Sequence, residues 1–579
     1  MLKKLAKYMH GLGYLCLASA LGMIIEAICE LAMPSIANSV YEQVRTASGD
    51  TTEIKQYVIK IGLLMLLMAI IGLTGGLITM KSSSVVSQKF SYRLRKSMYE
   101  KISSFSFKNI DTFSTSSLTT RMTNDVTMLQ NTLMMGLRIL VRGPALLVVS
   151  AVFAFSINAK LSLILIVLLP IMAAIIALIL KFGFPMFQKM QKRIDDLNRV
   201  VQENLIGIRV VKAYVREKEE KDKFHNASDN LAEQGAKAAG LVVTIMPIMM
   251  LLMNAVIVYI YYKGSIDASK GLMDVGQVSV FANYIMQVLM NIMMISMIML
   301  QLTRAKACGD RIVEVLDTEV DITNPENAYI PTSPKGELEF KNVSFGYNEG
   351  IDILNNISFK AKAGSIVGII GSTGCGKSSL VNLIPRLYDV TDGEILIDGV
   401  DVRKYDIEAL RDMIGFVLQK NLLFTGTIKE NIRWGKSDAT DEEIINACKS
   451  AQAHDFIMSL PDGYDTVLAQ GGLNLSGGQK QRLCIARAII KQPKILILDD
   501  STSAVDTATE AKIRECFYKE LKDTTVLIIA QRITSVMNAD EIIVLDDGMA
   551  ESIGTHDELM QSSEIYKEIF KTQQKGVME

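Results

Sequence analysis

Six apolar stretches in the first 300 residues constrain this chain more than any other feature of its sequence. Each approaches or exceeds the ~20 residues that a helix needs to cross the ~30 Å hydrocarbon core of a bilayer. The sequence therefore predicts an α-helical bundle of six transmembrane helices. The stretches lie near residues 12–38, 56–80, 136–157, 161–183, 240–262 and 276–300.

The loops between these stretches predict how the bundle lies in the membrane. The two long loops, 81–135 and 184–239, are rich in Lys and Arg, and both keep apolar residues at helical spacing. Basic loops stay on the cytoplasmic side, so we expect both termini there too, in a multi-pass protein of the cytoplasmic (inner or plasma) membrane with helices that extend beyond the bilayer. The basic start followed by a long apolar run shows no cleavage motif and is interpreted as a retained helix.

The second half of the chain has a different texture. We place a membrane domain at 1–318, a linker rich in Pro, Thr and Asn at 319–335, and an α/β domain at 336–579, where short apolar runs such as KILILDD alternate with helical patterns. The composition agrees, since 49% of residues are hydrophobic but 21% are charged. A net charge of -1 gives no reason to expect nucleic acid as a partner, and seven scattered cysteines indicate reduced thiols.

A glycine-rich loop in the second half predicts a nucleotide site. GIIGSTGCGKSSL fits G-x-x-x-x-G-K-[ST], follows an apolar run and leads into a helical pattern, which is the setting that a phosphate-binding loop requires. Backbone N–H groups of the loop would surround phosphate oxygens, Lys377 would contact the β- and γ-phosphates, and Ser378 would bind Mg²⁺. The predicted ATP-binding residues of the loop are Gly371, Ser372, Thr373, Gly374, Cys375, Gly376, Lys377, Ser378 and Ser379.

The apolar run ILILD ends at Asp499, whose carboxylate is a suitable hard ligand for the same Mg²⁺. Between the two motifs lies LSGGQ, in which a Ser hydroxyl and glycine N–H groups at a helix start could bind an anion. With these three motifs in this order, the chain resembles the ATP-binding cassette exporters that fuse six membrane helices to one nucleotide-binding domain. The resemblance covers nearly the whole chain.

The resemblance implies roles for further residues. The signature residues Ser476, Gly477, Gly478 and Gln479 would cap the ATP held by the other domain of a head-to-tail pair. Tyr347 matches the aromatic residue that stacks on adenine, Gln419 the loop glutamine that contacts Mg²⁺, and Asp506 the aspartate that crosses the dimer interface. The segments SFSFKNIDTFSTSSLTTRMTNDV and NLIGIRVVKAYVREKE look like the two cytoplasmic coupling segments of such exporters.

The chain departs from the pattern of the family in three places. Asp500 stands where active members have Glu to position the attacking water, and the shorter side chain would lie more than ~1 Å back, which can cost on the order of 10²-fold in rate. Gln531 stands where the family has His, and an amide cannot carry a proton. Gln470 and Gly471 replace a Glu-Arg pair.

These departures predict a degenerate ATP site in which Asp500, Gln531 and Gln419 occupy the catalytic positions. For any single departure, the alternative is sequence drift within a working site. In a heterodimer the intact LSGGQ would still complete the partner's site. The chain then resembles one subunit of bacterial heterodimeric multidrug exporters, with a homodimer as the alternative. ATP and Mg²⁺ are the expected cofactors.

The last predicted span carries two side-chain stripes. Ser279, Asn283, Gln287 and Asn291 recur every fourth residue, and Met286, Met290, Met293 and Met297 lie on an adjacent face. Amides in a membrane are costly unless they face partners or a wet cavity, and Met adapts to ligands of varied shape. We expect a cavity for small amphipathic substrates lined by Asn283, Met286, Gln287, Met290 and Asn291, with helix packing as the alternative.

Two carboxylates on the first predicted span, Glu26 and Glu30, are further substrate candidates. Intramembrane carboxylates are rare and functional by default, so they could attract cationic lipophilic substrates. The alternative is pairing with Arg138 or Arg142 of the third span.

Together these features predict ATP-driven export of amphipathic or drug-like compounds by one half of a membrane-embedded pair. A carrier of peptide, lipid or siderophore on the same scaffold, and a regulatory ATP-binding subunit that transports nothing, remain the alternatives.

Overall fold

The computed structural model describes residues 2–46, 51–347, 350–500 and 505–578. The side chains of some further residues, Met293 and Met297 among them, lie outside the described part. The chain forms two compact units, one of Met1–Ser103 with Ser116–Asp317 and one of Ser104–Thr115 with Thr318–Glu579. A short piece of the first long loop therefore belongs to the same unit as the C-terminal half.

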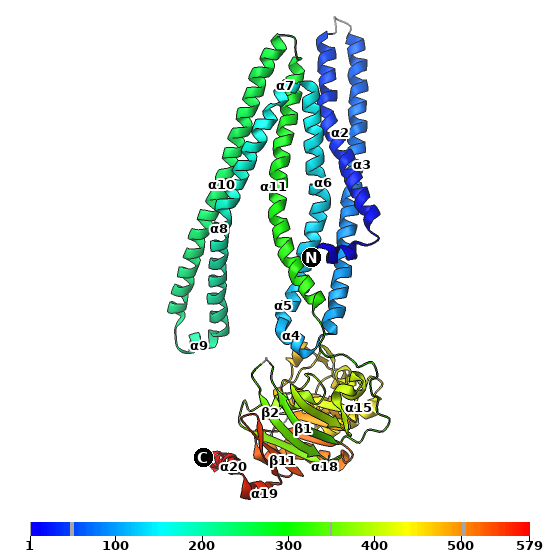
Figure 1. Cartoon of the computed structure of the whole chain (residues 1–579), viewed down its shortest axis with the longest axis vertical. Coiled ribbons are helices and arrows are strands. Elements are labelled where there is room, and N and C mark those ends of the chain that lie inside the picture. The colour runs from blue at the N-terminus through cyan, green and yellow to red at the C-terminus, as the bar shows by residue number, and fades with distance from the viewer. Residues whose placement is uncertain (1, 47–50, 348–349, 501–504, 579) are drawn as a thin grey trace. The chain divides into compact units, whose positions relative to one another are not determined.

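The first unit consists of long helices (Figure 1). The longest helices are α3 and α10, with 53 residues each. They are much longer than the ~20 residues that a helix needs to cross a bilayer. Helices α8 and α10 run alongside each other, and the short α9 lies at their common end. The helices are α1 (Leu2–Ala6), α2 (Gly13–Thr46), α3 (Thr51–Ser103), α5 (Thr115–Thr120), α6 (Val126–Ile157), α7 (Ala159–Ser162), α8 (Ile164–Ile206), α9 (Ile208–Ala213), α10 (Glu217–Ser269) and α11 (Val275–Asp317).

Four segments of the described residues are long and apolar enough to cross a membrane, namely Gly13–Arg45, Thr52–Ser103, Thr115–Ile157 and Pro247–Ser269. They overlap four of the predicted spans. The other two predictions, 161–183 and 276–300, fall on α7 with α8 and on α11, which are helical but are not among these four. The helical membrane domain is confirmed, and the number of six spanning helices stays a prediction.

Helices α2 and α3 approach closely because small residues face each other between them. A Cβ atom built on Gly22 would lie 2.6 Å from the carbonyl oxygen of Gly75, and one on Gly75 would lie 2.6 Å from that of Gly22. Nearby, the Thr79 hydroxyl donates a hydrogen bond of 2.9 Å to the Ser19 carbonyl. Small residues at such contacts let membrane helices approach with good van der Waals packing.

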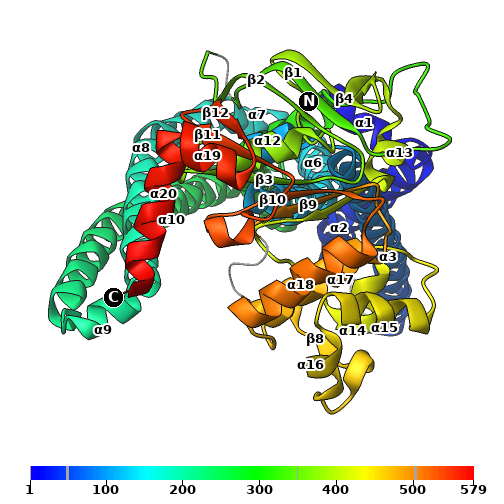
Figure 2. The same cartoon turned by 90° about the horizontal axis from the view of Figure 1, so that it is seen from below.

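The second unit is an α/β domain built on a six-stranded sheet in the order β12-β11-β3-β10-β9-β6 (Figure 2). All neighbours in it are parallel except β11 and β12. Strands β9 and β10 are buried along their whole length, which is why their sequences are continuous apolar runs rather than alternating ones. The six strands are β3 (Ile366–Gly371), β6 (Ile414–Val417), β9 (Ile495–Asp499), β10 (Thr525–Ile529), β11 (Glu541–Asp546) and β12 (Met549–Gly554).

An antiparallel sheet, β2-β1-β4-β5, and a pair, β7-β8, complete the strands of the described residues. Their bounds are β1 (Leu338–Phe345), β2 (Leu354–Ala361), β4 (Asp392–Ile397), β5 (Val400–Asp401), β7 (Gly426–Thr427) and β8 (Val467–Leu468). The helices of this unit are α4 (Phe107–Phe113), α12 (Lys377–Leu383), α13 (Ile407–Asp412), α14 (Ile428–Arg433), α15 (Asp441–Ser450), α16 (His454–Met458), α17 (Gly477–Ile489), α18 (Thr507–Glu520), α19 (His556–Ser562) and α20 (Glu564–Met578).

Candidate nucleotide site and membrane cavity

The glycine-rich loop connects the end of β3 to the start of α12. Gly374 and Gly376 have φ angles of +89° and +95°, a region that L side chains rarely adopt. A Cβ atom on Gly376 would also lie 2.7 Å from Leu354 Cδ2. The loop therefore needs glycine at both positions to bend around its centre.

Lys377 and Ser378 have partners within this site. The Lys377 ammonium donates to the carbonyl oxygens of Gly371 and Ser372, at 2.9 and 2.7 Å. The Ser378 hydroxyl donates to Asp499 Oδ1 at 3.1 Å, so two hard oxygen donors from neighbouring elements lie together. With the amide oxygen of Gln419 in the same cavity, this donor set fits Mg²⁺.

A cavity of about 300 Å³ gathers most of the residues that the sequence predicts. Gly371, Ser372 and Cys375 are not among its lining residues, and Cys375 is buried beneath the loop. The predicted residues that line the cavity are Thr373, Gly374, Gly376, Lys377, Ser378, Ser379, Gln419, Asp499, Asp500 and Gln531. The parallel sheet brings them together because β3, β9 and β10 all end at this edge.

Asp500 and Gln531 contact each other directly. The Gln531 side-chain amide donates to Asp500 Oδ2 at 2.8 Å, and the backbone of Asp500 has a φ of +46°. Burial raises the pKa of the Asp500 carboxyl above its ordinary value, while the charge of Lys377 and a hydrogen bond from Gln419 act in the opposite direction. Burial also raises the pKa of Asp499.

Tyr347 lies beside the phosphate loop rather than in the cavity. Its hydroxyl is 3.0 Å from the Ser379 hydroxyl on α12. Its ring packs at right angles against Tyr388, with ring centroids 5.1 Å apart. Tyr347 and Tyr388 both line a second cavity, of about 630 Å³, which also includes Asp111 of α4.

The signature residues are not among the residues that line the phosphate cavity of their own chain. Ser476 caps the N-terminus of α17 by accepting a hydrogen bond from the Gln479 backbone, and the Gln479 side chain accepts one from the Ser476 backbone. Ser476 and Gly477 are exposed. Asp506 caps α18 by accepting from the Thr509 backbone at 2.9 Å, and the preceding residues 501–504 lie outside the described residues.

Sequence reasoning missed the tie between α4 and this unit. The Tyr388 hydroxyl donates to Asp111 Oδ2 at 2.6 Å, and burial, together with this bond, raises the pKa of Tyr388 well above its ordinary range. The Asn109 side chain also donates to the Glu319 carbonyl at 3.2 Å. No sequence signal marks Tyr388, because its partner lies 277 positions away.

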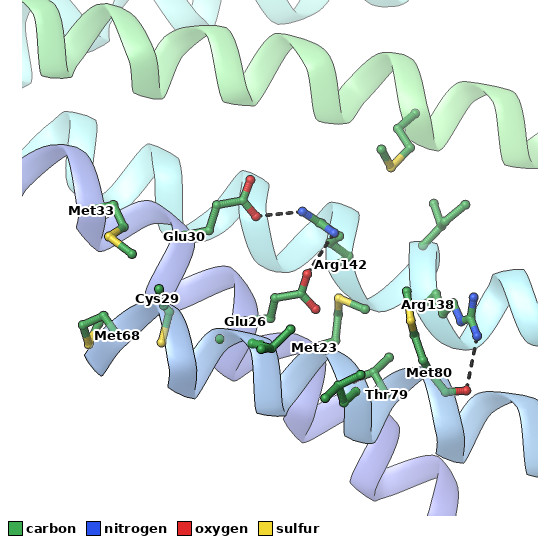
Figure 3. Close-up of a pocket in the computed structure, with 17 residues that line it drawn as sticks. Met23, Glu26, Cys29, Glu30, Met33, Met68, Thr79, Met80, Arg138 and Arg142 are labelled. Atoms are coloured by element: carbon green, nitrogen blue, oxygen red, sulfur yellow. Dashed lines mark hydrogen bonds and ion pairs between the residues drawn. The ribbon is translucent and has the colours of Figure 1, made fainter. Parts of the chain in front are cut away.

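A membrane cavity of about 600 Å³ lies among α2, α3 and α6 (Figure 3). Glu26 and Glu30 line it, and both form ion pairs with Arg142, at 3.2 and 2.7 Å. Arg138 lines it too, but donates to the Ser83 hydroxyl and the Met80 carbonyl. The structure therefore shows Glu26 and Glu30 paired with Arg142, which the sequence analysis gave as the alternative to substrate binding. The same residues also face a cavity.

None of the substrate candidates on α11 lines this cavity; Met294 of the same helix does. Asn291 is buried and donates to the Gln287 carbonyl of its own helix at 2.7 Å, while Met286 is half-buried. Asn283 and Met290 are exposed in the single chain.

This arrangement defines a class of protein: a membrane-bound P-loop ATPase whose signature segment lies apart from its own phosphate cavity. Two family models match the chain, one for the ABC transporter transmembrane region at residues 15–293 and one for the ABC transporter at residues 354–503. The chain belongs to the ABC transporter family, and it is an exporter that couples ATP hydrolysis to transport across a membrane.

Several relatives are similar over most of their length. The uncharacterized ABC transporter ATP-binding protein YfiB of Bacillus subtilis is 43% identical over 95% of each chain. YgaD of the same organism, whose name assigns it provisionally to multidrug export, is 35% identical over 84% of each chain. A solved structure of a bacterial Atm1-family ABC exporter with ATP bound has a TM-score of 0.81 at 25% identity, covering 97% of this chain and 98% of that one.

Proposed function

We propose that this chain is one half of a heterodimeric exporter of amphipathic or drug-like compounds, with a degenerate ATP site in its own cavity. The observation that carries the proposal is the contact between Asp500 and Gln531 at the phosphate cavity. Both residues differ from the Glu and His that the family pattern implies. Because ABC exporters act as dimers, the second half can supply what this one lacks.

The chemistry of the contact supports slow hydrolysis. The Asp500 carboxylate is one methylene shorter than Glu, and one of its oxygens already accepts from Gln531. Burial raises the pKa of Asp500, which by itself would strengthen a base, so the defect lies in reach rather than in proton affinity. The Gln531 amide can donate to a phosphate but cannot hold a positive charge beside it.

The signature segment supports a composite site. The N-terminus of α17 is exposed and capped, with its N–H groups and helix dipole available to an anion from another chain. This chain would therefore complete the partner's site, where turnover would occur, while its own ATP stays bound as part of the interface.

The second coupling segment supports the need for another chain. Around α9 the side chains of Ile206, Val210, Tyr214 and Val215 are 77%, 61%, 74% and 79% exposed. Apolar side chains gathered on a surface mark an interaction site. A second chain with the same architecture would provide a surface that covers these apolar side chains.

The test is ATP turnover by the chain purified alone in lipid, with its molecular mass, compared with the chain co-purified with a homologous half that carries Glu and His at the matching positions. We expect negligible turnover alone and strong turnover in the mixed dimer, with transport of amphipathic dyes. Vigorous hydrolysis by a homodimer that Asp500→Asn abolishes would contradict the degenerate site. Turnover without transport of dyes, peptides or lipids would favour a regulatory subunit.

A further inference from the structure

The walls of the cavity in Figure 3 come mainly from α2, α3 and α6, and Met294 of α11 completes them. The close contact of α2 with α3 places Glu26 against Gly76, where a Cβ atom would lie 3.0 Å from Glu26 Oε2. Helix α6 supplies Arg142 from the other side. The Glu26 carboxylate is thus held by backbone packing as well as by its ion pair, and the Glu30 carboxylate is held by its ion pair with the same arginine.

The positive and negative side chains that line this cavity are unevenly distributed. Arg142 donates to Oε1 of Glu26 and to Oε2 of Glu30, so a single guanidinium is shared by two carboxylates. The triad of Glu26, Arg142 and Glu30 therefore carries one net negative charge. Arg138, the other charged residue of the lining, has neutral partners and points away from the triad.

The triad is reachable from the cavity. The side chains of Glu26, Glu30 and Arg142 remain 26%, 39% and 31% exposed in the chain. A buried ion pair that served only to join helices would be expected to close over its charges, because charge facing a low-dielectric space is costly. Here the uncompensated charge faces about 600 Å³ of space.

Apart from Thr79, the rest of the lining is apolar, and much of it consists of flexible methionine side chains. Thioether side chains adapt to ligands of different shape and form favourable contacts with aromatic rings. Figure 3 shows several of them beside the carboxylates. The sulfur-bearing residues of the lining are Met23, Cys29, Met33, Met68, Met80 and Met294.

We infer that this cavity binds an amphipathic monovalent cation, whose charged group lies at the Glu26, Arg142 and Glu30 triad and whose apolar body contacts the methionines. One positive charge neutralises the triad, while Arg138 at the other end disfavours a second. The inference names a substrate class for the proposed exporter and rests on that function for its transport meaning. Binding itself requires neither ATP nor transport.

The experiment compares two ions of nearly equal size and opposite permanent charge, tetraphenylphosphonium and tetraphenylborate. Binding of each is measured by equilibrium dialysis against the full-length chain in lipid nanodiscs, alone and with its partner half, after subtraction of protein-free nanodiscs. We expect saturable binding of the phosphonium and none of the borate. Equal binding of both ions would overturn the inference, because charge would then play no part.

Two variants separate recognition from helix joining. The double variant Glu26→Gln with Glu30→Gln keeps polar partners for Arg142 but removes the negative charge, so phosphonium binding should weaken by about tenfold or more. Arg142→Gln removes the internal cation, so binding should be retained or become tighter. Glu42→Gln, on the same helix but not in the lining of the cavity, is the matched control.

A triad that only joins α2 to α6 predicts something different. Both variants would then lose binding together and would melt at lower temperature, which would refute the inference. Dye transport in closed proteoliposomes and ATP turnover, measured with the same protein variants, separate this result from the proposed function. If transport persists but phosphonium binding is the same in the triad variants as in the wild type, the inference alone is contradicted. If binding is as expected but no transport occurs, the proposed function alone is contradicted.

Discussion

At the scale of single residues, the phosphate cavity combines a well-formed binding loop with an altered pair at its far end. Lys377 and Ser378 have close partners within the site, and the Asp499 carboxylate beside Ser378 would supply an oxygen ligand to a divalent ion. Among the residues that line this cavity, Asp500 and Gln531 are the ones that differ from the family pattern, and they contact each other. Under the proposed function, nucleotide binding and hydrolysis therefore depend on different residues and should be separable by mutation.

Extending the carboxylate should restore hydrolysis. We expect Asp500→Glu to raise ATP turnover of the isolated chain by about tenfold or more, because the added methylene returns the carboxylate toward the attacking water. Adding Gln531→His should increase turnover more than the two separate effects predict, since the two side chains are in contact. Steady-state turnover in lipid is the measurement, with the exposed Asp523→Glu as control. Unchanged turnover in the double variant would place the defect elsewhere.

The pH dependence of Mg²⁺-nucleotide binding should reflect the buried aspartates. Because burial raises the pKa of Asp499, the folded site takes up its proton at higher pH than an ordinary aspartate of pKa 3.8. Affinity for Mg²⁺ with an ATP analogue should therefore fall as the pH is lowered through that raised pKa. The stability of the nucleotide-free domain should depend on pH in the opposite direction. At neutral pH the buried Asp499 charge lowers the stability, and protonation of this carboxyl removes that cost.

Titration of analogue affinity from about pH 7.5 to about pH 5, with and without Mg²⁺, checks this expectation. Asp499→Asn should flatten the Mg²⁺-dependent part of the curve. A curve that is the same for the variant and the wild type would contradict a role for Asp499 as a metal ligand.

At the scale of elements, close packing in the membrane unit and one hydrogen bond in the other unit decide where functional residues lie. The α2 and α3 pair is held by glycines, and α4 is held to the α/β unit by Tyr388. Both contacts join residues that are far apart in the sequence. Without them, the connecting loops would leave these segments free to rotate.

Adding a methyl group to the glycine contact should separate α2 from α3. Gly75→Ala would place its Cβ atom 2.6 Å from the Gly22 carbonyl, so we expect a loss of about 1–3 kcal/mol in stability and weaker phosphonium binding. Gly62→Ala, on the same helix with nothing within 4 Å of its Cβ, should behave as wild type. Melting temperature in detergent is the measurement, and equal effects of the two changes would contradict the contact.

Removing one hydroxyl should affect coupling more than hydrolysis. Tyr388→Phe keeps the ring that packs on Tyr347 but loses the donor to Asp111. We expect basal turnover of the assembled transporter to stay within about twofold, while its stimulation by a transported dye falls, because a hydrogen bond to a charged group is lost. Tyr518→Phe, which loses a bond to the Asn538 carbonyl in the same unit, is the control. Full stimulation in Tyr388→Phe would refute this expectation.

At the scale of the whole molecule, the signature segment and the phosphate cavity of one chain belong to different composite sites under the proposed function. The exposed N-terminus of α17 and the apolar residues around α9 are the surfaces that a second chain would cover. Changes at these surfaces should therefore act on the partner's chemistry.

The two halves of the nucleotide machinery should respond differently to mutation in the mixed dimer. Gly477→Asp keeps α17 stable, since an acidic residue suits a helix N-terminus, but it repels the partner's phosphate. We expect it to reduce turnover by about 10²-fold, a loss comparable to that of one oxyanion donor. Lys377→Met, in this chain's own loop, should weaken ATP retention with a smaller loss of turnover. Equal losses would indicate two equivalent sites.

The sequence by itself determined the membrane helices, the α/β domain and the phosphate loop. These depend on features within a few residues of one another: an apolar run of bilayer length, glycines at φ angles that only they adopt readily, and a Lys and Ser that begin a helix. Such local patterns survive in any arrangement of the rest of the chain, so they can be interpreted without it.

Only the tertiary structure decided which side chains meet across elements. Arg142 pairs with residues 116 and 112 positions away, and Tyr388 with one 277 positions away. The candidates on α11 carry the expected polar and methionine pattern, yet Asn291 turns to its own helix while Met294 faces the cavity. Periodicity fixes which residues share a face, but the rotation of a helix against its neighbours depends on packing along its whole length, and that decides which face meets the cavity.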